Sequence, residues 1–115
     1  MNTKPLTELQ SMTYQIIKDH GRSNPIIGAD IQRQINLTDR DHKKGANLRS
    51  IINALRDKGY AICASDEGYY YAQNPQELKD YIDEFQARIN QQQEACNSLI
   101  NKYNSWVGIV AYTAG

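Results

Sequence analysis

The feature that most constrains the fold is the run from Ile51 to Ala72, where a helical stretch passes directly into a hairpin. The helical pattern reaches back to Leu48 and has four apolar residues on one face: Leu48, Ile51, Ile52 and Leu55. After Gly59, the residues Ala61–Cys63 and Tyr69–Tyr71 have the composition of two strands, and Ser65–Gly68 has that of the turn between them. The sequence therefore predicts a helix followed by a short β-hairpin.

Two further helices fit upstream of this run. Thr7-Glu8-Leu9-Gln10 has the form of a capping box, which predicts a first helix over about Thr7 to His20, with Gly21 ending it in the left-handed conformation. In Asn24–Gly28, Asn-Pro interrupts the helical pattern and a β-branched pair follows, which predicts a short strand that pairs with the hairpin. Ala29–Ile35 then predicts a second helix. The predicted order is helix, helix, helix, hairpin.

The start of the third helix has two interpretations. Thr38-Asp39-Arg40-Asp41 is a second capping pattern, which places the start just after Thr38. Gly45 instead suggests an irregular opening and a start nearer Lys43.

A long helix is predicted after the hairpin. Asn74 suits the N-cap, Pro75 suits the first helical position, and Glu77 stands three residues after the cap, where it completes a capping box. Eight residues in it follow a 4-3 heptad spacing and are called the seam: Leu78, Ile82, Phe85, Ile89, Gln92, Cys96, Leu99 and Tyr103. The tail Ser105–Gly115 either prolongs this helix or folds back. The predicted domains are residues 1–73 and 74–115.

The seam has two candidate partners, the first helix of the same chain or a second chain. Leu78 to Tyr103 rises about 39 Å at 1.5 Å per residue, which is longer than a core of this size can cover. We therefore expect part of the seam to form a homodimer, with Gln92 as a polar position that sets the register.

Charge is unevenly distributed along a chain whose formal net charge is zero. Residues 40–58 contain six Lys or Arg against two Asp, whereas 76–103 contain three against five acidic residues. The candidate DNA-binding residues are Lys43, Lys44, Asn47, Arg49, Ser50 and Asn53. The alternative interpretation of these six residues is an ordinary solvated helix face.

The hairpin tip is acidic, with Asp66 and Glu67 where phosphate-binding wings carry Arg or Lys. Tyr69, Tyr70 and Tyr71 resemble a stacking platform for single-stranded bases, but strand alternation points them to opposite faces, which favours a structural role.

Other classes of function find little support. Cys63 and Cys96 are too far apart for a CxxC motif and are expected to be free, buried thiols, with no metal site. The chain has no nucleophilic triad, phosphate loop or cofactor motif, so we expect no enzyme and no cofactor. The first 30 residues lack a signal-peptide pattern and the tail is too short to span a membrane, so we expect a cytoplasmic protein.

The segments Ile27–Ile31, Leu48–Tyr60 and Gly68–Tyr71 resemble the winged helix-turn-helix of bacterial and phage regulators, over about 65 residues. With one long helix after the wing, the plan is similar to PadR-like repressors, which dimerise through such a helix. The resemblance implies an α+β, mostly α fold and a homodimeric, sequence-specific regulator that binds double-stranded DNA through the third helix. The acidic wing departs from that family.

Two alternatives stay open. One is a small phage or mobile-element protein that uses the winged helix to inhibit a host protein or nucleoprotein complex. The other is a replication-associated DNA-binding factor.

Overall fold

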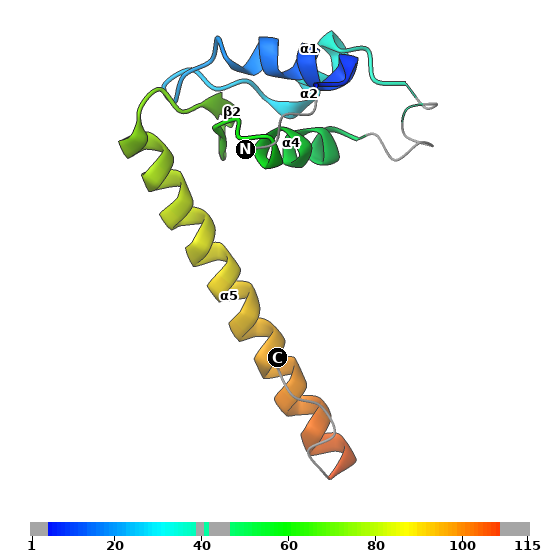
Figure 1. The fold of residues 1–115 in the computed structure, drawn as a ribbon. Helices are drawn as coiled ribbons and strands as arrows, with labels where there is room; N and C mark the ends of the chain where they lie inside the picture. The colour runs from blue at the N-terminus through cyan, green and yellow to red at the C-terminus, as the bar shows by residue number, and fades with distance from the viewer. Residues whose placement is uncertain (1–4, 39–40, 42–46, 109–115) are drawn as a thin grey trace. The chain divides into compact units, whose positions relative to one another are not determined.

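The computed structural model describes residues 5–38, 41 and 47–108. The described chain is α+β and mostly helical. Its elements are α1 (Glu8–Ile17), α2 (Gly28–Gln34), α4 (Leu48–Asp57), β1 (Ile62–Ser65), β2 (Gly68–Tyr71) and α5 (Pro75–Val107) (Figure 1). The chain divides into two units, Met1–Lys79 and Asp80–Gly115, so the first turn of α5 belongs to the first unit.

Helix α1 begins as its sequence predicts and ends earlier. The Thr7 side chain accepts from the Gln10 N–H (3.1 Å), and the Gln10 side chain accepts from the Thr7 N–H (3.1 Å). The helix stops at Ile17, three residues short of His20, and the His20 N–H bonds to the Ile17 carbonyl in a tighter turn (2.9 Å). The His20 carbonyl then accepts a bond from the Tyr71 N–H (2.8 Å). The prediction that Gly21 adopts the left-handed conformation was wrong, since its φ is not positive.

Helix α2 ends at a left-handed asparagine rather than a glycine. Asn36 has φ 53°, a conformation that asparagine tolerates better than other side chains. Beyond it, Thr38 and Asp41 form the reciprocal bonds of the predicted capping box, at 3.0 Å and 3.2 Å. Helix α4 itself begins at Leu48, later than either predicted start, and residues 39, 40 and 42–46 lie outside the described chain.

The hairpin pairs β1 with β2 antiparallel, with Ile62 opposite Tyr71 and Ser65 opposite Gly68. Ile26 forms the predicted additional pairing: its N–H donates to the Tyr69 carbonyl (2.8 Å) and the Tyr69 N–H donates back (2.8 Å). The segment before α2 is therefore fixed against β2, on the edge opposite β1.

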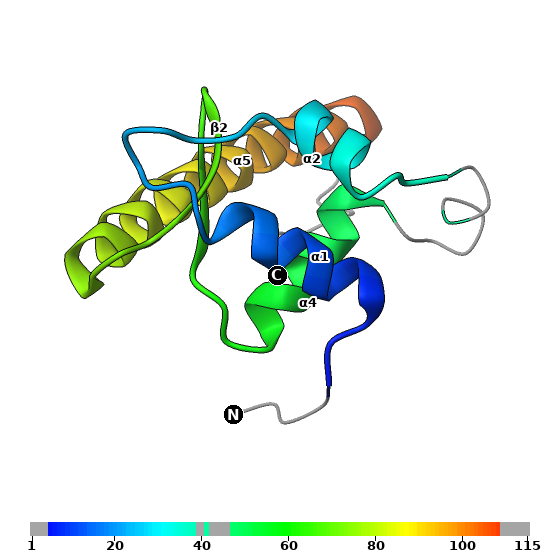
Figure 2. The same ribbon diagram turned by 90° about the horizontal axis from the view of Figure 1, so that it is seen from above.

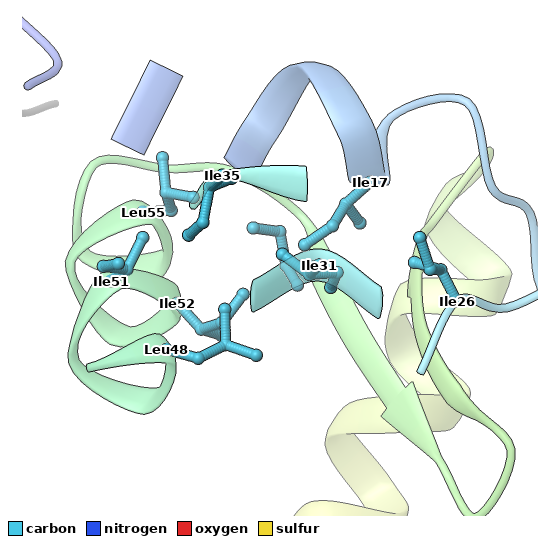
Figure 3. Packing of buried hydrophobic residues seen from close by; sticks show 9 residues of the cluster. Ile17, Ile26, Ile31, Ile35, Leu48, Ile51, Ile52 and Leu55 are labelled. Carbon is cyan, nitrogen blue, oxygen red and sulfur yellow. The ribbon is translucent and has the colours of Figure 1, made fainter. Parts of the chain in front are cut away.

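The core of the first unit lies between α1, α2 and α4 (Figures 1 and 2). Ile31 of α2 lies near its centre, with Ile17 of α1 and Ile52 of α4 beside it (Figure 3). The four apolar residues predicted for α4 are all buried. Tyr69 and Tyr71 pack against this core. The ring of Tyr14 in α1 contacts Tyr60 at a tilt of 58° and meets Tyr71 edge to face.

Tyr70 and its cross-strand partner Cys63 are buried on the other side of the hairpin from the tyrosines that touch the core. This alternation confirms the structural interpretation of the three tyrosines. Cys63 is a free, buried thiol as predicted, but Cys96 is exposed, so the prediction of burial was wrong for that residue.

Helix α5 is one continuous helix of 33 residues. Its start is as predicted, with Asn74 accepting from the Glu77 N–H (3.0 Å) and Glu77 accepting from the Gln73 N–H (3.1 Å). No helix in the described part of the chain is long and apolar enough to cross a membrane.

We predict that Gly68→Ala destabilises the first unit by about 3 kcal/mol or more, because φ is +137° and a Cβ would stand 2.4 Å from the Ile26 carbonyl oxygen. Gly59→Ala is the matched control: φ is +94° but the space is open, so the cost is about 1–2 kcal/mol of backbone strain. Urea unfolding of both variants measures the difference. Equal losses would contradict the close approach at Ile26.

We predict that stability falls with rising pH in a way that depends on Cys63. Burial raises the pKa of this thiol, and the Tyr70 hydrogen bond and the charge of Arg56 offset only part of the effect. Above the ordinary thiol pKa of about 8.5 the unfolded chain releases this proton while the folded chain retains it, so stability falls by up to about 1.4 kcal/mol per pH unit. Unfolding between pH 7 and 10 should show this slope in the wild type and Cys96→Ala, and a shallower one in Cys63→Ala.

Candidate nucleic-acid interface

The outer face of α4 carries the described candidates for DNA contact. Asn47, Arg49, Ser50 and Asn53 are all exposed. The other two predicted positions, Lys43 and Lys44, lie outside the described residues. The structure therefore brings four of the six predicted residues together on the first two turns of one helix.

Two of these four residues are used to start the helix. The Asn47 side chain accepts from the Ser50 N–H (2.9 Å), and the Ser50 hydroxyl oxygen accepts from the Asn47 N–H (3.1 Å). The Ser50 hydroxyl also lies 2.8 Å from the Asn47 carbonyl oxygen, to which it donates. This is a full capping box, so Asn47 and Ser50 are bound to the backbone and to each other.

Arg49 and Asn53 are outside this capping network. They stand four residues apart, which places them on the same side of α4. Arginine suits the O6 and N7 atoms of guanine and asparagine suits the N6 and N7 atoms of adenine, so the pair has the chemistry of direct base readout in a major groove.

The basic residues at the end of α4 have internal roles. Arg56 is half-buried, and its Nε donates to the Ile62 carbonyl (2.9 Å), which ties α4 to β1. The Lys58 ammonium donates to the Gln10 side chain (2.6 Å) and to the Pro5 carbonyl (3.2 Å). Both charges are used in contacts within the first unit, so neither adds to the outer face of α4.

The hairpin tip is exposed at Ser65, Asp66 and Glu67. Ser65 accepts from the Glu67 N–H (3.2 Å), so the tip is organised by its own side chains. Both carboxylates face solvent at the point where a wing would approach phosphate, and they disfavour that approach.

A hollow of about 510 Å³ lies between the starts of α1 and α4. Its lining is Thr7, Glu8, Leu9, Gln10, Asp41, Ser50 and Ile51. The two acidic residues in this lining make it unsuited to phosphate. Across the described residues, no group of three or more His, Cys, Asp or Glu is placed to hold a metal ion.

The seam forms an exposed apolar surface along α5. Leu78, in the first turn, is half-buried, and the other seven seam residues are exposed, from Phe85 at 38% to Leu99 at 73%. Trp106 continues the spacing and is 75% exposed. A soluble chain rarely leaves such a continuous row uncovered, so the row has the character of an interaction surface.

Cation–aromatic contacts along the seam were not found by sequence reasoning. Arg88 lies over the rings of Phe85 (5.5 Å) and Tyr81 (5.8 Å), and Lys102 lies over Trp106 (5.3 Å). Tyr81 also meets Phe85 edge to face, with ring centroids 5.7 Å apart. The signal was present as aromatic and basic residues three, four or seven positions apart. These contacts hold both cations beside the seam.

Comparison of the chain with protein-family models, with curated proteins and with solved structures gives no match.

We predict that Asn47→Ala destabilises the fold by about 1 kcal/mol, because it removes the cap of α4. Asn53→Ala removes the same amide from the exposed face of the same helix and should change stability by less than about 0.5 kcal/mol. Chemical denaturation compares the two variants. If both leave stability unchanged, the capping box of α4 is not formed in solution.

Proposed function

We propose that this protein is a homodimeric, sequence-specific DNA-binding regulator of the winged helix-turn-helix class, with α4 as the helix that enters the major groove. The observation that carries the proposal is the pairing of Ile26 with Tyr69. It supports the order of helix, strand, helix, helix and hairpin in which the first strand lies beside the second wing strand.

The outer face of α4 supports the DNA-binding part of the proposal. In this arrangement Arg49 and Asn53 read base edges, while the α4 N-terminus, capped by Asn47 and Ser50, approaches a phosphate. Lys43 and Lys44 precede the N-terminus of α4 in the sequence, and we propose that they contact the phosphate backbone of the DNA.

The seam supports the homodimer. Two copies joined through α5 would present two α4 helices to successive major grooves, so the proposed target is a palindromic site. The exposed acidic tip supports a limited role for the wing, which leaves recognition mainly to α4.

We predict that Arg49→Ala and Asn53→Ala each weaken binding to the selected duplex by about 1–3 kcal/mol, or about 5- to 150-fold, and relax the preference at one base position. Arg22→Ala is the matched control, because it removes the same charge from the segment between α1 and Ile26. Selection from a random duplex pool followed by gel shifts at several salt concentrations measures both effects.

The DNA-binding proposal fails if duplex affinity at low salt equals that of a charge-matched control protein and does not respond to Arg49→Ala or Asn53→Ala. That result would favour the second candidate, a small phage or mobile-element protein that inhibits a host protein or nucleoprotein complex. The exposed Asp66 and Glu67 at the hairpin tip favour this candidate, because they suit a basic protein surface better than phosphate.

A further inference from the structure

We infer that α5 pairs with α5 of a second copy in parallel and in register, so that each seam residue meets its own counterpart. This inference rests on the proposed homodimer and specifies its geometry. It is drawn from the polar layer at Gln92 and from the two cations, Arg88 and Lys102, that the ring contacts hold beside the seam.

The parallel arrangement satisfies the polar layer. The seam is apolar on both sides of Gln92 and Cys96. In register, the two Gln92 amides meet, and each offers a donor and an acceptor to the other. The next layer brings the two Cys96 thiols together, and every other layer joins two apolar residues.

The parallel arrangement also places both cations opposite neutral residues. Arg88 and Lys102 each stand one position before a seam residue, Ile89 and Tyr103. In a parallel pair such a residue faces the position five further along the other helix. Arg88 therefore faces Gln93 of the second copy, and Lys102 faces Val107.

The antiparallel alternative brings like charges together. Its best match of apolar layers sets Gln92 against Cys96 of the second copy, and Phe85 against Tyr103. In that register the flanking positions pair Arg88 with Lys102 of the second copy, twice per dimer. Like charges in direct opposition are destabilising, and the ring contacts limit how far either cation can move away.

Other antiparallel registers either place Gln92 opposite an apolar residue or pair fewer of the seam residues. A shift of one heptad in one direction sets the Gln92 amide against Ile89 of the second copy, which leaves a buried amide without a partner. A shift in the other direction sets Gln92 against Tyr103 of the second copy and places Ile82 and Phe85 opposite positions beyond Val107, where α5 ends. The parallel, in-register pair is the arrangement that avoids both costs and the charge repulsion.

Oxidative cross-linking of the full chain tests the orientation. In a Cys96→Ala background, Ile82→Cys places one thiol near the start of the seam. In the parallel pair the two thiols share a layer at disulfide distance, whereas in the antiparallel pair they lie about 36 Å apart along the axis. Asp83→Cys is the matched control, because it places a thiol one residue away and off the seam.

We expect Ile82→Cys to form a disulfide dimer at least about tenfold faster than Asp83→Cys, and wild-type protein to cross-link through Cys96. A second experiment mixes Ile82→Cys with Trp106→Cys, both in the Cys96→Ala background. Preferential linkage between the two variants would overturn the parallel arrangement, as would a dimer in which Ile82→Cys and Asp83→Cys react equally.

Sedimentation and duplex binding separate this inference from the proposed function. A chain that stays monomeric at high concentration would overturn the inference and the homodimer together. A parallel dimer that binds no duplex would confirm the inference while the DNA-binding proposal fails. A duplex-binding dimer linked between positions 82 and 106 would overturn only the inference.

Discussion

The two backbone hydrogen bonds between Ile26 and Tyr69 are the constraint on which the first unit depends. They bring the segment between α1 and α2 against the hairpin and fix where α2 begins. The close approach explains the glycine at position 68, where any side chain would meet the Ile26 carbonyl. Next to this pairing, the Tyr71 N–H donates to the His20 carbonyl and fixes the segment after α1 against the hairpin. A few hydrogen bonds between distant segments therefore help to position three helices around one core.

The sequence predicts those parts of the fold whose signals are local. The Thr7 and Asn74 caps, the apolar face of α4, the hairpin turn and the short strand at Ile26 depend on neighbouring residues, and the structure has each of them. The errors occur where distant contacts decide. Helix α1 ends before His20, whose carbonyl bonds to the distant Tyr71, and Arg56 turns inward to the Ile62 carbonyl; a helical pattern shows neither contact. In the candidate site, sequence reasoning selected an exposed helix face but did not separate its capping residues from the others.

The exposed polar residues of α4 fall into two groups, those that cap the helix and those that do not. Capping asparagine and serine are the same residue types that contact nucleic acid, so composition alone assigns both roles to the same positions. The hydrogen bonds distinguish them. The side chains of Asn47 and Ser50 bond to backbone N–H groups at the start of α4, whereas those of Arg49 and Asn53 lie outside this capping network. Helix capping and the proposed recognition are thus assigned to different residues of the same two turns.

The exposed seam has a consequence for how the chain becomes ordered. A single helix in water is marginally stable unless another element packs on its apolar face. The middle of α5 is polar and includes Asn90 and Asn97, whose intrinsic helix propensity is below that of alanine, leucine or glutamine. Its side-chain bonds, such as Gln86 to Asn90 (3.0 Å), are exposed. If α5 pairs with a second copy as proposed, the free energy that keeps this helix formed comes largely from association. Its folding is then a bimolecular event, and the concentration of the protein sets how much of the helix is ordered.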